Sequence, residues 1–174
     1  NGISQLQVEI GTFSNNAQVV GTYTTVADAQ AAINGLTPGT SNTNYEAALK
    51  TLNTMVSLDP SADKRIVYLL TDGAPTTGAW LDTAAIVDGM TSLSYLSDPA
   101  IEINAVGIGL NGGSAGANLN AIDNTTDGYL AVNNFSDLSA GLGSLFSPVS
   151  VGNDTLIGNE GNDVIFGDSI HSDN

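Results

Sequence analysis

Thr43 and Asp72 are the residues whose types and positions suggest chemistry, namely the binding of a hard cation through side-chain oxygens. Asp72 directly follows the unbroken apolar run 66–70, a pattern typical of a parallel strand covered on both faces. Open α/β sheets bind ligands just beyond the carboxyl ends of such strands. Thr43 lies in the loop before the helix that leads into this strand. Because both loops emerge at the same edge of a doubly wound sheet, we expect the two side chains to share one ion.

Each of these residues also has a simpler interpretation. Asp72 followed by Gly73 is a common turn sequence after a strand. Thr43, with Glu46 three residues later, fits the capping box that satisfies free N–H groups at the start of a helix. A single hydroxyl has too few lone pairs to serve fully as both cap and ligand. The local pattern alone favours the cap for Thr43 and leaves Asp72 open.

The elements that would position these residues alternate between strand and helix. Apolar periodicity predicts strands over about 5–13, 18–23, 65–71, 101–108 and 129–132, and helices over about 26–33, 45–56, 80–96, 118–122 and 136–146. This alternation predicts an α/β fold with a doubly wound, mostly parallel sheet between two helical layers. After Pro148 the composition changes, so we expect one domain over 1–147 and a different segment over 148–174.

The charge balance is strongly acidic and limits the classes of partner. Eighteen acids against three bases give a formal net charge of −15. This balance argues against nucleic acid and against an anionic membrane surface, because almost nothing could neutralise phosphates. Cations are the natural partners of such a surface. The chain has no cysteine, which excludes thiolate metal sites, and no apolar run approaches the ~18 residues of a membrane span, so we expect no membrane insertion.

A nine-residue repeat distinguishes the end of the chain. Gly152-Asn153-Asp154-Thr155-Leu156-Ile157 is followed at a spacing of nine by Gly161-Asn162-Asp163-Val164-Ile165-Phe166. Glycines permit tight turns, the aspartates supply carboxylate oxygens, and the apolar positions can fill a thin core. The alternative is an acidic, disordered tail, which the regular period disfavours.

Enzyme and nucleotide functions find little support. The segment 107–112 reads Gly-Ile-Gly-Leu-Asn-Gly and Asp127 follows twenty residues after Gly107, as in a dinucleotide fingerprint. However, Gly107 falls inside a predicted strand, and Asp127 begins a strand where the ribose-binding acid should end one. The only histidine, His171, lies near the end of the chain, and no serine or threonine has an evident base. We therefore expect a binding protein and not an enzyme.

Three segments resemble the von Willebrand factor type A domain: 12–14 (Thr-Phe-Ser), 41–49 (Ser-Asn-Thr-Asn-Tyr-Glu-Ala-Ala-Leu) and 68–76 (Tyr-Leu-Leu-Thr-Asp-Gly-Ala-Pro-Thr). Their order and spacing match, and the likeness covers about residues 3–146. The resemblance implies a divalent cation, usually magnesium, on top of the sheet, where a binding partner supplies an acidic group as a further ligand. Thr43 and Asp72 match two of the family's ligand positions.

The chain departs from that family in one respect. The Asp-x-Ser-x-Ser motif, which supplies the other side-chain ligands, is absent together with its strand and helix. In the family this strand lies at the centre of the sheet, so we expect two inner strand edges to be unpaired and the magnesium site to be partial. We expect the 174 residues to be a fragment that functions as a monomer within a larger polypeptide.

The repeat resembles the calcium-binding RTX nonapeptide. That resemblance implies the start of a parallel β-roll in which the calcium-binding residues are Gly152, Asn153, Asp154, Gly161, Asn162 and Asp163. In such rolls a calcium site is shared between turns on the same side. Because only two good repeats are present, we expect weak or no calcium binding by this tail alone.

Together the two resemblances are typical of large bacterial adhesins exported by type I secretion. They imply an extracellular or cell-surface segment that binds a protein or surface ligand, possibly one offering a carboxylate, with Ca²⁺ in the repeats and Mg²⁺ at the partial site. Two other interpretations remain open: an accessory region of a secreted RTX toxin or enzyme, and a metal-free structural spacer.

Overall fold

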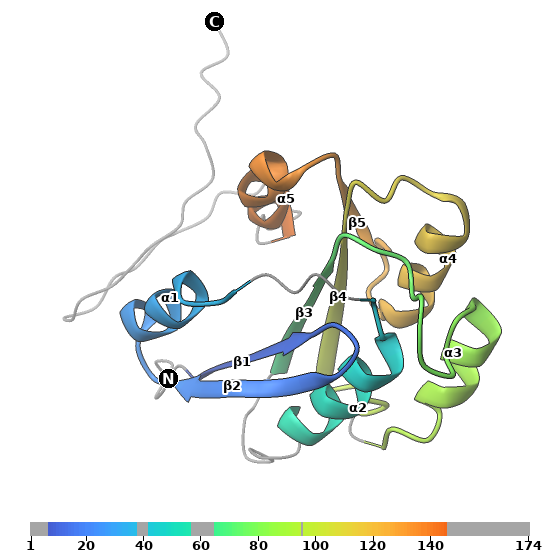
Figure 1. Cartoon of the computed structure of the whole chain (residues 1–174), viewed down its shortest axis with the longest axis horizontal. Coiled ribbons are helices and arrows are strands. Elements are labelled where there is room, and N and C mark those ends of the chain that lie inside the picture. The colour runs from blue at the N-terminus through green and yellow to red at the C-terminus, as the bar shows by residue number, and fades with distance from the viewer. Residues whose placement is uncertain (1–6, 38–41, 57–64, 95, 146–174) are drawn as a thin grey trace, which may run out of the picture.

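The strands form two separate sheets (Figure 1). The computed structural model describes residues 7–37, 42–56, 65–94 and 96–145. Strands β1 (Val8–Phe13) and β2 (Ala17–Tyr23) form an antiparallel hairpin. Strands β3 (Arg65–Thr71), β4 (Ile101–Ile108) and β5 (Leu130–Val132) form a parallel sheet in that order. The α/β class and the parallel sheet confirm the predicted fold.

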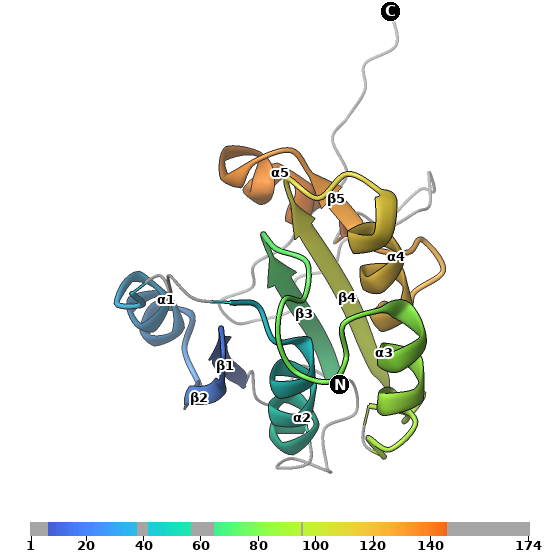
Figure 2. The same ribbon diagram turned by 45° about the vertical axis from the view of Figure 1, so that its right-hand side comes forward.

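The two sheets are divided where the absent strand was expected. β3 ends the parallel sheet on one side, and among the described residues no strand joins it to the hairpin. Figure 2 shows β1 and β2 beside β3, with open space between the ribbons of the two sheets. Ile66 on β3 keeps 44% of its surface exposed, although it lies in the apolar run 66–70. As far as the structure describes the chain, the inner edges of the two sheets are unpaired, as predicted from the sequence.

Five helices are found in the described ranges, and two of them differ markedly from their predicted spans. Their bounds are α1 (Val26–Asn34), α2 (Tyr45–Val56), α3 (Thr83–Met90), α4 (Gly113–Ile122) and α5 (Leu138–Leu145), with a short 3₁₀ turn η1 (Phe135–Asp137) before the last. The prediction of a helix over 80–96 was too long, because the Asp82 carboxylate accepts from Ala85 N at 2.9 Å and so starts α3 at Thr83. The prediction for α4 began five residues too late.

The core lies on both faces of the parallel sheet, as in a doubly wound fold. On one face α2, α3 and α4 pack against β3 and β4, and the fully buried side chains there include Tyr45, Leu49, Ile86, Ile103, Leu119 and Ile122. On the other face α5 packs through Leu138 and Leu142 against Val106, Ile108 and Val132. Between these two helical layers β3 and β4 run parallel, so their carboxyl ends lie at one rim of the sheet.

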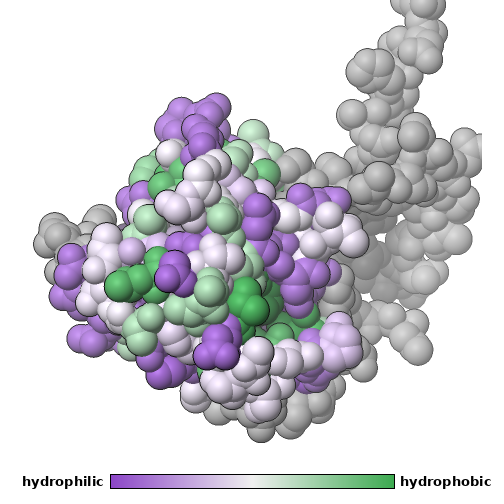
Figure 3. Space-filling model, turned by 90° about the vertical axis from the view of Figure 1, so that its right-hand side faces the viewer, coloured by the Kyte–Doolittle hydropathy of each residue, from purple (hydrophilic) through white to green (hydrophobic). Residues whose placement is uncertain are grey.

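The apolar residues seen on the surface in Figure 3 are scattered. On the face of α3 and α4, hydrophobic residues lie in small groups separated by hydrophilic ones (Figure 3). Leu81 and Val87 are the large exposed apolar side chains near α3. Among the described residues, no helix combines the length and apolar character that a membrane span requires. The predicted β-roll and its calcium residues lie in 148–174, outside the described residues.

Candidate functional site

Thr43 and Asp72 lie together, as their loops predicted. Both line a pocket of ≈ 290 Å³ at the carboxyl end of β3. Ser14, which follows β1, and Asn42 line the same pocket. The pocket therefore brings together three loops that are far apart in the sequence.

Backbone hydrogen bonds join the Thr43 loop to the loop after Asp72. Thr43 O accepts from Thr76 N at 2.8 Å and from Thr77 N at 3.3 Å. In return, Thr43 N donates to Thr76 Oγ1 at 2.9 Å. These bonds fix the main chain of Thr43 against the segment that follows the candidate carboxylate.

Gly73 allows the closest approach between the two loops. A Cβ atom built on Gly73 would lie 2.8 Å from Thr43 Oγ1, closer than real Cβ contacts permit. The Thr43 hydroxyl thus lies directly against the residue that follows Asp72. A side chain at position 73 would displace the Thr43 hydroxyl.

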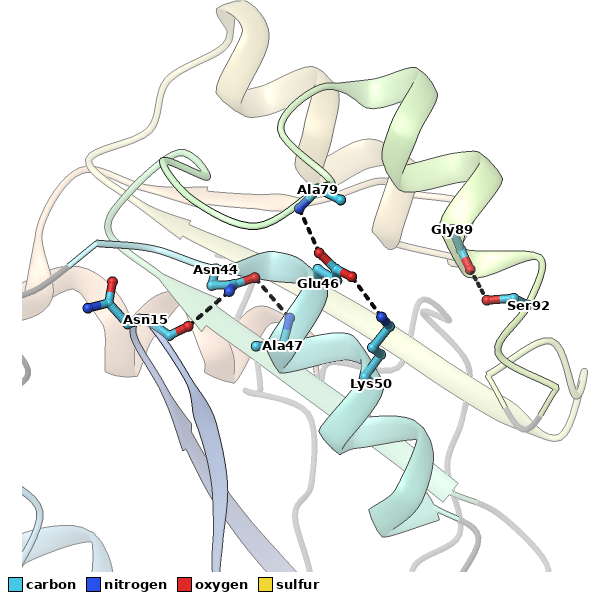
Figure 4. A network of polar contacts seen from close by, with 8 residues as sticks. All are labelled: Asn15, Asn44, Glu46, Ala47, Lys50, Ala79, Gly89 and Ser92. Atoms are coloured by element: carbon cyan, nitrogen blue, oxygen red, sulfur yellow. Dashed lines mark hydrogen bonds and ion pairs between the residues drawn. The ribbon is translucent and has the colours of Figure 1, made fainter.

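Asn44, and not Thr43, caps helix α2, so the capping-box interpretation of Thr43 is wrong. Asn44 Oδ1 accepts from Ala47 N at 3.0 Å, while Asn44 Nδ2 donates to Asn15 O at 2.9 Å in the turn of the hairpin (Figure 4). Two adjacent residues of capping type made the sequence ambiguous at this point. Because Asn44 performs the capping, the Thr43 hydroxyl is left for another role.

Glu46 holds the far end of the Asp72 loop to α2. Its carboxylate accepts from Ala79 N at 2.6 Å and from Lys50 Nζ at 2.7 Å (Figure 4). These two bonds, with Lys50 the larger effect, hold the pKa of Glu46 below its ordinary value. Lys50 Nζ also lies 5.7 Å from the centre of the Trp80 ring. The sequence analysis gave Glu46 a local capping role and missed this long-range contact.

Within the part of the chain that the structure describes, the side-chain oxygens of Thr43 and Asp72 are available as ligands. Among the described residues, no hydrogen bond to Thr43 Oγ1 or to the Asp72 carboxylate is found, and the Asp72 side chain is exposed. An unpaired carboxylate beside an unpaired hydroxyl is a donor arrangement that suits a hard cation.

The oxygen atoms of the pocket are of the type that such a cation prefers, but the described residues supply few of them. The described residues contain no group of three or more His, Cys, Asp or Glu side chains able to hold a metal ion. Asp72 is the single charged residue named in the pocket lining, next to hydroxyl and amide oxygens. Magnesium retains several waters and needs only one or two protein carboxylates. The site can therefore contribute part of a coordination sphere, with positions open to water or to an oxygen of a partner.

The pocket also has apolar lining residues. Leu70, Ile108, Leu138 and Phe135 are among them, and Phe135 has 66% of its surface exposed. The polar lining residues come mainly from the three loops described above. The pocket can thus contact a polar group and an adjoining apolar group of the same partner.

The fingerprint-like segment 107–112 differs from a dinucleotide-binding turn at its first glycine. Gly107 lies inside β4, which ends at Ile108, and Asp127 precedes β5 without following a strand. A residue inside a strand cannot form the tight phosphate-binding turn that the fingerprint requires.

Family comparisons agree with both resemblances and with their order. The model of the von Willebrand factor type A domain matches residues 2–74, a stretch that contains Thr43 and Asp72. The model of the RTX calcium-binding nonapeptide repeat, of four copies, matches residues 150–169. A search of curated proteins found no match.

Among solved structures, the pilus adhesin SpaC from Lactobacillus rhamnosus GG, in its open conformation, resembles this fold with a TM-score of 0.62 and 18% sequence identity. The match covers 80% of this chain and 24% of the adhesin, so the chain spans only a part of that protein's length. An uncharacterized membrane spanning protein from Vibrio fischeri matches with a TM-score of 0.33 and 19% identity over 80% of this chain and 74% of that one. The first likeness supports the fold, and the second is too weak to carry an argument.

Proposed function

We propose that this chain, a von Willebrand factor type A domain followed by RTX calcium-binding repeats, is a ligand-binding segment of an extracellular bacterial adhesin and not an enzyme. In this proposal Thr43 and Asp72 hold a divalent cation, Mg²⁺ or a similar ion, at the rim of the sheet. The partner is a protein or surface ligand that supplies a carboxylate to the ion.

The observation that carries the proposal is the pair of unpaired oxygens on two converging loops. Thr43 and Asp72 line one pocket, and hydrogen bonds fix the loops around them. A bound ion would supply positive charge at a rim of a strongly acidic chain, which would otherwise repel a carboxylate. The ion would therefore be required for an acidic partner to bind.

The apolar residues of the pocket indicate that the partner also carries an apolar group. Phe135 and Leu138 line the same pocket as the polar loops, so an apolar group next to the partner's carboxylate would bury surface there. In the proposal, the tail adds calcium sites that complete a β-roll only when further repeats are stacked on it. The likeness to a pilus adhesin fits this assignment.

A residue-resolved titration tests the proposal. The isotope-labelled full chain, freed of calcium, is titrated with MgCl₂ and then with a trace of MnCl₂ while amide signals are recorded. We expect the amides of Thr43, Asp72 and Gly73 to move with Mg²⁺ and to broaden with Mn²⁺, with an affinity on the order of millimolar because only one carboxylate is present. The residue-resolved signal separates this pocket from ions bound to acids of the tail.

Two variants complete the test. Asp72→Asn removes the carboxylate and should abolish the response of the pocket. Asp88→Asn, on the exposed surface of α3, removes the same charge outside the pocket and should leave the response unchanged. Equal responses from wild type and Asp72→Asn, or none from wild type, would favour a metal-free spacer.

A further inference from the structure

We infer that Tyr45 is a positioning residue for the site: its buried hydroxyl fixes the turn that carries Asp72 relative to Thr43. The inference rests on the proposed function, because it concerns the same pair of oxygens. The apolar periodicity over 45–56 places Tyr45 in a helix but assigns no role to its hydroxyl.

The hydroxyl of Tyr45 is bonded to the turn that follows β3, beside the Thr71 side chain that ends this strand. Tyr45 has 0% of its surface exposed, and its hydroxyl donates to Gly73 O at 2.8 Å. Thr71 Oγ1 donates to the same carbonyl at 3.0 Å and accepts from Gly73 N at 3.3 Å. The residues on both sides of Asp72 are thus held in place, while its own carboxylate stays free.

Tyr45 also connects the turn to the other two loops of the pocket. It is the first residue of α2, two residues after Thr43, so one side chain links the backbone near Thr43 to the carbonyl next to Asp72. The edge of its ring meets Phe13 at the end of β1, with centroids 6.4 Å apart and planes at 73°. Ser14 of the same pocket directly follows Phe13. All three loops therefore converge on this residue.

The bond from the Tyr45 hydroxyl to Gly73 O is formed in the absence of any ion. Such a donor keeps the turn in one arrangement before an ion binds.

Tyr45→Phe tests the inference, because it removes the hydroxyl and keeps the ring. The matched control is Tyr129→Phe: the Tyr129 hydroxyl accepts from Gly112 N at 2.9 Å and donates to Leu110 O at 3.1 Å, and Tyr129 does not line the pocket. Two quantities are measured on the full chain: the Mg²⁺ affinity of the pocket amides, and the hydrogen-exchange rate of the Gly73 amide without metal. The thermal midpoint of each variant shows that it is folded.

We expect Tyr45→Phe to weaken Mg²⁺ binding about tenfold, the lower end of effects from residues that orient metal ligands. The same variant should speed exchange of the Gly73 amide by about tenfold or more. Tyr129→Phe should change neither the Mg²⁺ affinity of the pocket nor the exchange rate of the Gly73 amide, even if it lowers the thermal midpoint as much as Tyr45→Phe does. Thr71→Val, which removes the other hydroxyl from the turn, should act in the same direction as Tyr45→Phe.

A folded Tyr45→Phe protein with wild-type affinity and wild-type Gly73 exchange would overturn the inference. Failure of the proposed function would look different, since wild type itself would then show no response to Mg²⁺. In that case the exchange rate of Gly73 alone still decides whether Tyr45 holds the turn.

Discussion

Gly73 and Thr43 approach each other so closely that a methyl group at position 73 would lie 2.8 Å from Thr43 Oγ1. Gly73→Ala should therefore displace the hydroxyl, destabilise the fold by about 1–3 kcal/mol and weaken Mg²⁺ binding. Urea unfolding and the Mg²⁺ titration measure the two effects.

Gly143→Ala in α5 is the matched control. A Cβ there meets no described atom within 4 Å, so this helix substitution should stabilise the fold by about 0.5–1 kcal/mol. Wild-type stability and affinity in Gly73→Ala would show that the two loops do not constrain each other.

Asn44 carries out two tasks, and its loss should cost more than that of an ordinary helix cap. Asn44→Ala removes the cap on Ala47 N and the bond to Asn15 O that ties the hairpin to α2. We expect a loss of about 2 kcal/mol in unfolding free energy, at the upper end for caps. Thr25→Ala removes the cap on Asp28 N and the bond from Thr25 Oγ1 to Asp28 Oδ2, both within the first turn of α1, and should cost about 1 kcal/mol or less. Equal losses in the two variants, measured by urea unfolding, would mean that the tether to Asn15 contributes nothing.

The raised pKa of Tyr45 predicts a loss of stability in alkali. In the unfolded chain the phenol ionises near pH 10, while in the fold it holds its proton to about pH 12. The contribution of the buried phenol is thus complete below pH 10 and is lost progressively as the pH rises toward 12, because the unfolded state releases its proton first. The loss amounts to roughly 2–3 kcal/mol. The measurement is the denaturation midpoint between pH 9 and pH 12, where Tyr45→Phe should flatten the decline; an unchanged slope would contradict the prediction.

The lowered pKa of Glu46 predicts a smaller loss of stability at acidic pH. Its pKa is lowered by Lys50 and by Ala79 N, so the stabilisation it provides is present above the ordinary value of 4.5 and is lost as the pH falls through the lower value of the fold. Glu46→Gln should lower stability at pH 7 and should make stability depend less on pH between pH 7 and pH 3. Glu9→Gln on the hairpin, where the carboxylate makes only contacts of 3.4–3.5 Å, is the control and should change little. Thermal scans from pH 3 to pH 7 decide between the two outcomes.

The tail predicts weak calcium binding in this chain. Residues 150–169 match the RTX repeat family, yet they hold about two nonapeptides, and the family model comprises four. Because a site needs turns stacked on the same side, Ca²⁺ should bind with an affinity no better than about millimolar and without a cooperative gain of strand structure. Circular dichroism of the full chain during a Ca²⁺ titration measures this. Tight, cooperative folding that disappears in the double variant Asp154→Asn and Asp163→Asn would contradict it.

Most of the fold was predictable because apolar periodicity and buried strands carry local signals. The apolar run 66–70 and the helical periodicity over 45–56 predicted β3 and α2 with the bounds that the structure has. Local pattern failed where a tertiary contact sets the boundary. Trp80 is buried outside any helix and packs so closely on Gly89 that a Cβ there would lie 2.0 Å from its ring, and α3 starts only after the Asp82 cap.

The site was predictable in its topology and not in its supporting contacts. Parallel-sheet connectivity alone brought Thr43 and Asp72 to the same rim. The roles of Tyr45 and Glu46 were missed because their partners, Gly73 and Ala79, are 28 and 33 residues away in the sequence. Helical periodicity assigns a residue to a face but says nothing about what its polar atom binds.

The central claim is that Thr43 and Asp72 bind the same divalent cation. Its most direct measurement is anomalous X-ray scattering from a crystal of the full chain soaked with Mn²⁺, in which manganese replaces the magnesium ion. The account predicts a peak in the pocket about 2.0–2.3 Å from both Thr43 Oγ1 and an Asp72 carboxylate oxygen, absent in Asp72→Asn. Manganese found only at other acidic groups, with the pocket empty in wild type, would contradict it.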